Sequence, residues 1–309
     1  MNIITLTPNP AIDIHLACDS FKMGGYNSSR ELSRESAGKG VNVSRALAEN
    51  GIPNICYIML GKERAESYLA PLADYNMTVK CSFTDGACRE NINIHHRGSE
   101  TVIAGDGPKV TRENVDAFLK SLKQYSGEGT YLVLSGSISS ASDKDAILEA
   151  LFKLSASGVS IIVDTKSYSL EEIIPLRPYL IKPNEEEAEL LTGLSVKTDE
   201  DAIAAAKAML DMGIQNVLLT RGDAKTVLAA DDGIYLAEPP RVKVASTVGA
   251  GDSTVAGFLF GIYRGYDTEE CLRSAVAFGT AACTTEGTLP PPTCQVNAIK
   301  PRVKITKVE

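Results

Sequence analysis

Residues 131–164 read YLVLSGSISSASDKDAILEALFKLSASGVSIIVD, and this stretch contains the pattern that decides the fold. Tyr131–Leu134 and Ser160–Asp164 are short, almost continuous apolar runs, as expected of strands that are buried on both faces. Between them, Ser142–Lys153 has apolar residues at helical spacing. The stretch therefore predicts two parallel strands joined by a crossover helix.

The same alternation continues over most of the chain. Further strands are expected at Asn2–Leu6, Asn54–Leu60, Tyr179–Ile181 and Asn216–Leu219, and further helices at Asn42–Glu49, Arg112–Lys123, Asp199–Met212 and Val255–Tyr263. Short apolar strands separated by helices indicate a mostly parallel sheet with helices on both faces. We therefore expect an α/β sandwich of the doubly wound type, formed by residues 1–309 as a single domain.

Two regions depart from this alternation. Ile12–Leu16 and Ser28–Arg34 flank the pair Gly24-Gly25, and Asn91–His96 and Glu100–Ala104 flank Gly98-Ser99. Polar and apolar residues alternate on both sides of each glycine pair, which is typical of β-hairpins. We expect these hairpins, at approximately residues 12–35 and 88–106, to form a small β lid on the sandwich.

The composition excludes several classes of function. The net charge of −8 argues against nucleic acid as a partner, because binding to the phosphate backbone needs a basic surface. No apolar run approaches the roughly 20 residues that span a bilayer, so we expect no membrane. The seven cysteines form no CxxC pair, and the three histidines offer little material for a zinc site. We expect a cytoplasmic protein with reduced thiols that serve as small core residues.

The motif with the most chemistry is STVGAGDST at residues 246–254, which directly precedes the apolar helix Val255–Tyr263. Glycines at a helix start let several backbone N–H groups converge at the positive end of the helix dipole, and this forms an anion hole. The carboxylate of Asp252 is expected in the first helical turn, where it can accept a proton from an attacking hydroxyl. The alternative is a glycine-rich helix start in which Asp252 is an ordinary N-cap.

A second glycine motif, AGKGVNV at residues 37–43, also precedes an expected helix. Its glycines allow a polyol to approach the backbone closely, and Asn42 can make directional hydrogen bonds. The alternative is a helix start with a solvated Lys39.

Four motifs in order carry a resemblance to a known family. They are TPNPAID at residues 7–13, GKGVN at 38–42, KPNEEE at 182–187 and GAGD at 249–252. With this order and spacing, the chain resembles the phosphofructokinase-B group of ribokinase-like sugar kinases from Thr5 to about Thr288. Within that group it is most similar to 1-phosphofructokinases and tagatose-6-phosphate kinases.

The resemblance implies a ribokinase-like Rossmann-type sandwich whose β lid covers the sugar and is often shared in a homodimer. It implies an ATP-dependent kinase for a ketohexose phosphate, either tagatose 6-phosphate or fructose 1-phosphate, with fructose 6-phosphate as a third option. Asp252 is then the catalytic base, and the amides of Gly249, Ala250 and Gly251 form the anion hole.

The resemblance also assigns binding residues. On the sugar side these are Asp13, Gly38, Lys39, Asn42, Arg89 and Ser137, with Arg89 near the phosphate of the substrate. On the ATP side they are Lys182, Asn184, Thr220, Gly222, Thr247, Gly249, Gly251, Ala282 and Thr285. Asn184 and Glu187 are implied to place Mg²⁺ through water, and the alternative for them is a solvated acidic helix face.

The sequence also departs from the family pattern. Ala37 replaces a glycine, Ser28 replaces a basic residue in the lid, and residues 137–141 and 220–226 differ from the usual loops. These departures affect the sugar site and the nucleotide loop more than the phosphoryl-transfer centre. Two alternatives stay open: a kinase for an unphosphorylated sugar or nucleoside, and a non-catalytic nucleotide-binding regulatory protein.

Overall fold

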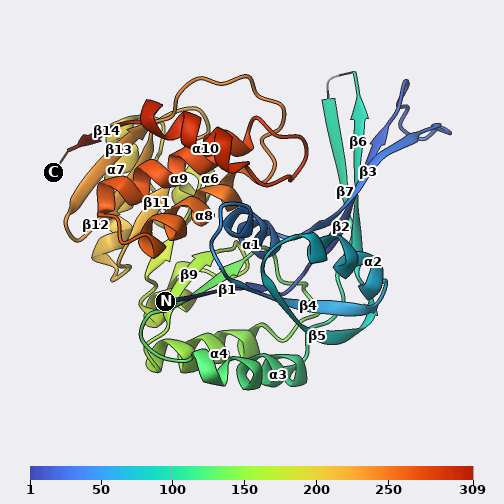
Figure 1. The fold of residues 1–309 in the computed structure, drawn as a ribbon, viewed down its shortest axis with the longest axis horizontal. Coiled ribbons are helices and arrows are strands. Elements are labelled where there is room, and N and C mark those ends of the chain that lie inside the picture. Colours follow the sequence, from blue (N-terminus) through green and yellow to red (C-terminus); the bar gives the residue numbers. More distant parts are fainter. Residues whose placement is uncertain (98, 309) are drawn as a thin grey trace.

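The computed structural model describes residues 1–97 and 99–308. In it, ten strands form one large sheet, in the order β14-β13-β12-β11-β10-β9-β8-β1-β4-β5 (Figure 1). The strands of this sheet are β1 (Asn2–Thr7), β4 (Ile55–Glu63), β5 (Thr78–Ala87), β8 (Thr130–Ser135), β9 (Ser160–Asp164), β10 (Leu180–Ile181), β11 (Val217–Leu219), β12 (Thr226–Ala230), β13 (Gly233–Glu238) and β14 (Lys304–Lys307).

The predicted crossover at residues 131–164 is confirmed. Strands β8 and β9 pair in parallel, with Tyr131 opposite Ser160 and Leu134 opposite Val163. The strands from β5 across to β11 are all parallel to their neighbours, whereas β12, β13 and β14 extend the sheet with antiparallel pairs. The expected α/β class with a mostly parallel sheet is therefore correct, and an antiparallel edge is added to it.

Helices cover both faces of this sheet (Figure 1). They are α1 (Lys39–Glu49), α2 (Ala65–Leu69), α3 (Arg112–Leu122), α4 (Lys144–Ala156), α5 (Leu170–Ile173), α6 (Glu185–Thr192), α7 (Asp199–Asp211), α8 (Ala250–Tyr263), α9 (Thr268–Ala282) and α10 (Thr293–Ile299). Short 3₁₀ turns occur at Ala70–Asp74, Lys123–Tyr125, Ile174–Leu176 and Lys300–Arg302.

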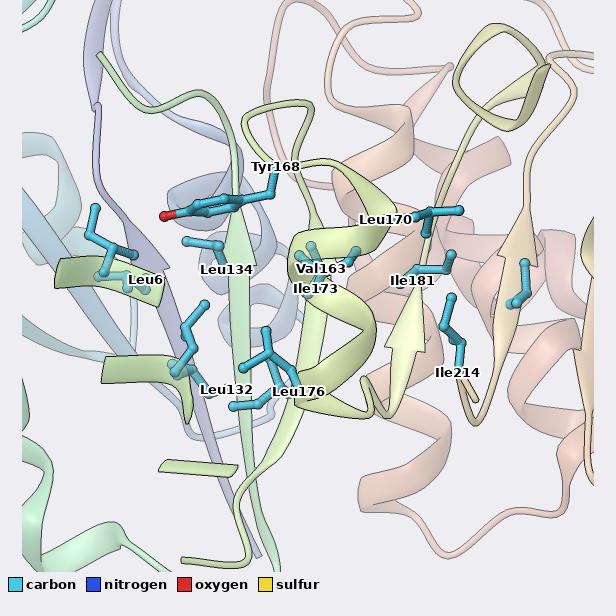
Figure 2. Packing of buried hydrophobic residues seen from close by; sticks show 14 of the residues in the cluster. Leu6, Leu132, Leu134, Val163, Tyr168, Leu170, Ile173, Leu176, Ile181 and Ile214 are labelled. Carbon is cyan, nitrogen blue, oxygen red and sulfur yellow. The ribbon is translucent and has the colours of Figure 1, made fainter. Parts of the chain in front are cut away.

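Alternate residues of the buried strands point to opposite faces and form two cores. Leu132 and Leu134 of β8 pack in one cluster with apolar residues of α3, α4, α5 and α7 (Figure 2). Val133, which lies between them in the sequence, packs in the other cluster with residues of α1, α8, α9 and α10. Burial on both faces explains why these strands are continuous apolar runs in the sequence.

A second, four-stranded sheet projects from the body in the order β3-β2-β6-β7 (Figure 1). Its strands are β2 (Ala11–Ala17), β3 (Arg30–Ala37), β6 (Arg89–His96) and β7 (Ser99–Ala104). Both predicted hairpins are present as antiparallel pairs, and β2 and β6 join them in parallel. Gly98 of the second predicted turn lies outside the described residues. Whether this sheet acts as a lid, and whether the chain is one functional domain, stay predictions.

In the described residues, no helix has the length and apolar character needed to cross a bilayer. The seven cysteines are all unpaired. Cys18, Cys56, Cys88 and Cys271 are buried, as expected of core residues, and Cys81 and Cys283 are partly buried. Cys294 is exposed, so the expectation of a core position is wrong for this residue.

Candidate active site

The chemistry-bearing residues gather where parallel strands end. Strand β8 ends at Ser135, β9 ends at Asp164, and Lys182 follows β10 directly. These strands are neighbours, so their carboxyl ends meet at one edge of the sheet. After β1 the chain leads to β4, which pairs with one edge of β1, whereas the later strand β8 pairs with the opposite edge of β1. Ligands of open α/β sheets bind at such a switch point, outside the carboxyl ends of the strands.

The start of α8 has the form that the sequence predicts. Gly249 is the N-cap with φ of +77°, and Asp252 lies in the first turn. The first N–H groups of a helix have no acceptor within the helix and are suited to binding an anion. Of these, Ala250 N donates to Thr247 O at 3.3 Å, and the anion-hole role of Gly249, Ala250 and Gly251 stays a prediction. A methyl group added at Gly251 would lie 3.3 Å from Lys182 Nζ, so this ammonium group lies directly beside the helix tip.

Asp252 is 95% buried and is held by one directional hydrogen bond. Its Oδ2 accepts a hydrogen bond of 2.8 Å from Asn42 Nδ2 on α1. Burial, followed by the negative charge of Asp164, raises the pKa of Asp252, while Lys39, Asn42 and Lys182 oppose the increase. A carboxylate with a raised pKa that remains charged at neutral pH is suited to the role of a general base.

Asp164, which belongs to none of the predicted motifs, lies at the centre of the charged cluster. Its Oδ1 lies 3.3 Å from Lys182 Nζ and 3.4 Å from Lys39 Nζ, and its Oδ2 accepts a hydrogen bond from Ser135 Oγ. Burial alone would raise the pKa of Asp164, but the two lysines outweigh it and the pKa is lowered. The charged carboxylate thus orients two ammonium groups toward the edge where an anion would bind.

The second glycine motif lies against the end of β1. Helix α1 begins at Lys39, three residues before the predicted start. Gly38 has φ of +143°, and a Cβ at Gly40 would lie 2.4 Å from Thr7 Oγ1, so a side chain does not fit at either position. Burial lowers the pKa of Lys39, but Asp164, Asp252 and Glu187 outweigh burial and raise it. Lys39 and Asn42 therefore both lie close to Asp252, and their role toward a sugar stays a prediction.

The other predicted sugar-side residues lie on or beside the small sheet. Asp13 accepts a hydrogen bond of 2.8 Å from Asn91 Nδ2, and burial raises its pKa. Arg89 starts β6, has a long contact of 3.5 Å to Gly105 O, and its buried Nε has no partner among the described residues. Burial lowers the pKa of Arg89 and Asp13 opposes this shift. Ser137 is exposed at the end of β8 and accepts a hydrogen bond from Asn9. Arg89 thus retains donors for a ligand.

Asn184 and Glu187 form a reciprocal capping box at the start of α6. Asn184 Oδ1 accepts from Glu187 N at 2.8 Å, and Glu187 Oε2 accepts from Asn184 N at 2.9 Å. Glu187 Oε1 lies 3.5 Å from Lys166 Nζ, beside a cavity of about 160 Å³ that Asp164 and Lys182 also line. One carboxylate oxygen at this edge fits a water-mediated Mg²⁺ contact, the mode that this ion favours. The magnesium role of the pair stays a prediction.

Thr220 lies beside Asn184, because the two residues form a parallel bridge beyond the ends of β10 and β11. Gly222, two residues further on, has φ of +57° and open space around it. The remaining predicted nucleotide-side residues lie in the segment before α8 and at the end of α9. These two segments are joined where Ala245 N donates to Cys283 O at 2.8 Å. Through this bond the segment with exposed Thr247 lies near the end of α9, where Ala282 is buried. The hydroxyl of Thr285, in the loop that follows, donates to Ala282 O and to Leu289 O. The nucleotide roles of these residues stay predictions.

All three histidines lie on the small sheet, and two of them form a further group. Donor atoms of His15, His95 and Glu100 lie within 4.8 Å of one another, and His15 Nδ1 lies 2.9 Å from His95 Nε2. Metal-bound histidines donate their other ring N–H to an acceptor. The buried Nε2 of His15 has no partner among the described residues. The group therefore lacks the outer hydrogen bonds of a built metal site.

Comparisons with known proteins agree on one family. The model of the pfkB family of carbohydrate kinases matches residues 9–294. The chain is 30% identical to 1-phosphofructokinase of Bacillus subtilis over 99% of this chain and 100% of that protein. It is 29% identical to 1-phosphofructokinase of Escherichia coli over 91% of this chain and 90% of that protein.

A solved structure has the same fold. The structure of phosphofructokinase-2 of Escherichia coli in complex with substrates and products matches with a TM-score of 0.91 and 24% identity. This match covers 98% of this chain and 99% of that chain. At this level of identity the comparison establishes the ribokinase-like architecture alone.

Proposed function

The chain belongs to the pfkB family of carbohydrate kinases, and we propose that it is a 1-phosphofructokinase, which transfers the γ-phosphoryl group of ATP to O6 of fructose 1-phosphate. As a member of this family it is a phosphotransferase with an alcohol group as acceptor. The observation that carries the proposal is the buried carboxylate of Asp252 at the open tip of α8, with two lysines beside it.

The proposed reaction is a direct in-line transfer. The primary hydroxyl oxygen of the sugar attacks the γ-phosphorus, the bond from this phosphorus to the β,γ-bridging oxygen breaks, and ADP leaves. Asn42 occupies Oδ2 of Asp252, which leaves Oδ1 to accept the hydroxyl proton. The product is then fructose 1,6-bisphosphate, and Asp252 returns its proton to solvent.

The positively charged groups around Asp252 can stabilise a phosphoryl group as it moves from the bridging oxygen of ATP to the sugar hydroxyl oxygen. We assign the γ-phosphate to the first-turn amides of α8 at Gly249, Ala250 and Gly251. The Ala250 N–H would exchange its long bond of 3.3 Å to Thr247 O for the phosphate. Lys182 lies beside the same helix tip, and Lys39 is oriented by Asp164. Mg²⁺, when bound through Asn184 and Glu187, would neutralise charge on the ATP phosphates. These groups raise turnover to the extent that they bind the charge that develops during transfer more strongly than the charge of bound ATP.

We infer that Arg89 recognises the phosphate that the sugar already carries. Its guanidinium lies half-buried near Asp13, with an unpartnered Nε. A planar guanidinium can bind a phosphate through two parallel hydrogen bonds. Asp13 would then hold sugar hydroxyls between this cation and Asp252.

We also infer that a second copy of the chain covers the small sheet. Leu32 on β3 and Val102 and Ile103 on β7 are large apolar side chains that are about half exposed. Exposed apolar side chains on β3 and β7, the two edge strands of this projecting sheet, favour a protein contact over solvent. Sedimentation velocity would give a dimer mass for the wild type, and a monomer at all concentrations would exclude this arrangement.

We expect the pH dependence of kcat/KM to have an acid limb that Asp252 sets. Burial and Asp164 raise the pKa of Asp252 to about 6. The base is therefore protonated and inactive as the pH falls through this value, and it is charged and active above it. Initial rates between pH 5 and 8, at constant ionic strength, would measure the limb. A rate that stays nearly constant down to pH 5, as expected for a carboxyl with its ordinary pKa of about 4, would contradict this environment.

We expect Arg89→Ala to raise the KM for the sugar phosphate roughly 10- to 100-fold, because a charge-assisted hydrogen bond contributes about 1.5–3 kcal/mol. The KM for ATP should change little. Arg112→Ala is the matched control, because Arg112 at the start of α3 forms an exposed ion pair with Glu149 of α4. Steady-state kinetics in both substrates would measure the effect, and an unchanged KM for every sugar phosphate would remove Arg89 from this role.

An ADP-release assay over a small panel of acceptors tests the proposed substrate. The panel contains fructose 1-phosphate, tagatose 6-phosphate, fructose 6-phosphate, free fructose and a nucleoside. The proposal requires the highest kcat/KM for fructose 1-phosphate. A preference for tagatose 6-phosphate would keep the mechanism but change the substrate. Equal activity on free fructose would indicate a kinase for unphosphorylated sugars, and ATP binding without turnover would indicate a regulatory protein.

A further inference from the structure

The hydrogen bond that holds Asp252 depends on the orientation of one side-chain amide. Asn42 Nδ2 donates to Asp252 Oδ2 at 2.8 Å, and Asn42 Oδ1 accepts from Arg45 Nη2, also at 2.8 Å. A guanidinium group can only donate hydrogen bonds. Arg45, one helical turn after Asn42 on α1, therefore keeps the amide oxygen on its own side and turns the amide nitrogen toward Asp252.

Arg45 is itself an unusual buried residue. It is 96% buried, and no carboxylate lies within the 4 Å of an ion pair among the residues that the structure describes. A charge without a counterion is costly to bury, so its position requires compensation from other contacts. Its Nη2 donates to Thr288 O at 2.8 Å and to Thr288 Oγ1 at 2.9 Å, and the ring of Tyr75 lies 5.9 Å from its guanidinium carbon.

Thr288 continues the chain of hydrogen bonds to the small sheet. Its hydroxyl accepts from Arg45 and donates to Glu35 Oε2 at 2.7 Å. Glu35 is on β3, directly opposite Asp13 of β2. The backbone of the loop after α9 lies in close contact with this carboxylate, since a Cβ at Gly287 would lie 2.9 Å from Glu35 Oε1. Arg45 is thus linked to two carboxylates through one residue each. Asn42 connects it to Asp252, and Thr288 connects it to Glu35.

We propose that Arg45 and Thr288 are positioning residues for phosphoryl transfer, which fix the Asn42 amide against Asp252 and connect it to Glu35 on the sugar-facing strands. This inference rests on the proposed role of Asp252 as the base. The chain of contacts joins β3 and α1, which follow each other in the sequence, to two distant segments, the start of α8 and the loop after α9. It forms fully only when β3 lies against that loop, so the base is aligned when the small sheet is in place.

The chain of contacts predicts a direction for the titration of Asp252. The groups that face this carboxylate are Asp164 from β9, Lys39 and Asn42 from α1, and Lys182 after β10. Asn42 lowers the pKa of Asp252 by donating to its charged form. If Arg45 loses its hydrogen bond to Thr288 Oγ1, it holds the Asn42 amide less firmly against Asp252, and the pKa of Asp252 should rise.

The variant Thr288→Val tests the proposal, because it removes the bridging hydroxyl and keeps the shape and the backbone carbonyl. We expect kcat to fall roughly tenfold, as for loss of one buried hydrogen bond to a charged group. The KM values for ATP and sugar should change less than twofold. The acid limb of kcat/KM should move to higher pH. Glu35→Ala should have a similar effect, and the double variant should be no worse than the stronger single variant.

Thr284→Val is the matched control. Thr284 lies in the same loop as Thr288, but its hydroxyl bonds to Ala281 O of α9 and to Gln295 of α10, outside this chain of contacts. It should leave kcat and the acid limb unchanged. Arg45→Lys keeps the positive charge but replaces the planar guanidinium with a single ammonium group, so we expect a loss of kcat smaller than that of Thr288→Val. Equal effects of Thr284→Val and Thr288→Val, or no effect of Thr288→Val, would overturn the proposal.

A readout without turnover separates this inference from the proposed function. Carbon-13 NMR of the labelled Asp252 carboxyl reports its pKa in the wild type and in Thr288→Val, whether or not the protein phosphorylates any sugar. A higher pKa in the variant supports the positioning role, and an unchanged pKa contradicts it. Absence of turnover by the wild type on every acceptor would instead overturn the proposed function.

Discussion

Replacing Asp252 with asparagine is expected to lower kcat by about 10²–10⁴-fold, the usual contribution of general-base catalysis. Asparagine has nearly the same shape, and its carbonyl oxygen can still accept the hydrogen bond from Asn42. It cannot take the hydroxyl proton at any accessible pH. Steady-state rates with ATP and fructose 1-phosphate would measure the loss, and calorimetry should find ATP binding almost unchanged.

The matched control is Asp85→Asn, which makes the same chemical change on the surface of β5, where the exposed side chain of Asp85 pairs with Lys62. This variant should have wild-type kinetics. Retention of substantial turnover by purified Asp252→Asn would exclude Asp252 as the base. Loss of ATP binding in the same variant would mean that the carboxylate acts mainly on nucleotide affinity.

The second large effect is on stability and involves Asp164. Its carboxylate is buried with Lys182, and Lys39 lies on its other side. Asp164→Asn leaves the buried ammonium of Lys182 without its counterion, so we expect a loss of about 3–5 kcal/mol in the free energy of unfolding. Urea denaturation would measure this loss. The acid limb of kcat/KM should also move to lower pH, because the charge of Asp164 raises the pKa of Asp252.

A second variant distinguishes loss of the counterion from a general packing defect. Asp164→Asn combined with Lys182→Met removes both charges, and we expect it to recover most of the lost stability. Asp85→Asn again serves as the surface control, because exposed ion pairs contribute little. If the double variant is less stable than Asp164→Asn alone, the two charges are not coupled as described.

Much of the fold can be predicted from local sequence patterns. Ser160–Asp164 has the predicted bounds because a strand buried on both faces is an unbroken apolar run. The antiparallel edge at β12 and β13 was missed, although Asp231-Asp232 before Gly233 separates two apolar runs as a hairpin turn does. Strand β5 was missed because polar residues interrupt it, and its pairing with β4 depends on contacts across the fold.

The site could be predicted only in part. Glycine motifs at helix starts are local signals, and Asp252, Lys39 and Asn42 do lie together. Asp164 was detectable as an acid at the end of an apolar strand, but its two lysine partners come from segments far apart in sequence. Arg45 gave no signal, because a charged residue in a helical pattern usually faces solvent, and only the tertiary fold buries it.

The departures in the nucleotide loop have a structural counterpart. Lys225 of this loop lies 2.7 Å from Asp199 at the start of α7. Arg221 contacts the same carboxylate at 2.6 Å. The loop is thus tied to α7 by two cations. This anchoring leaves Thr220 beside Asn184.

Phosphorus NMR of the products tests the central claim most directly. We expect wild-type protein, with ATP and fructose 1-phosphate, to form ADP and a new phosphomonoester at O6 in a ratio of one to one. Asp252→Asn at the same concentration should form neither within the same time. A wild-type spectrum with no new sugar ester, or the same product at the same rate from Asp252→Asn, would contradict phosphoryl transfer at the tip of α8.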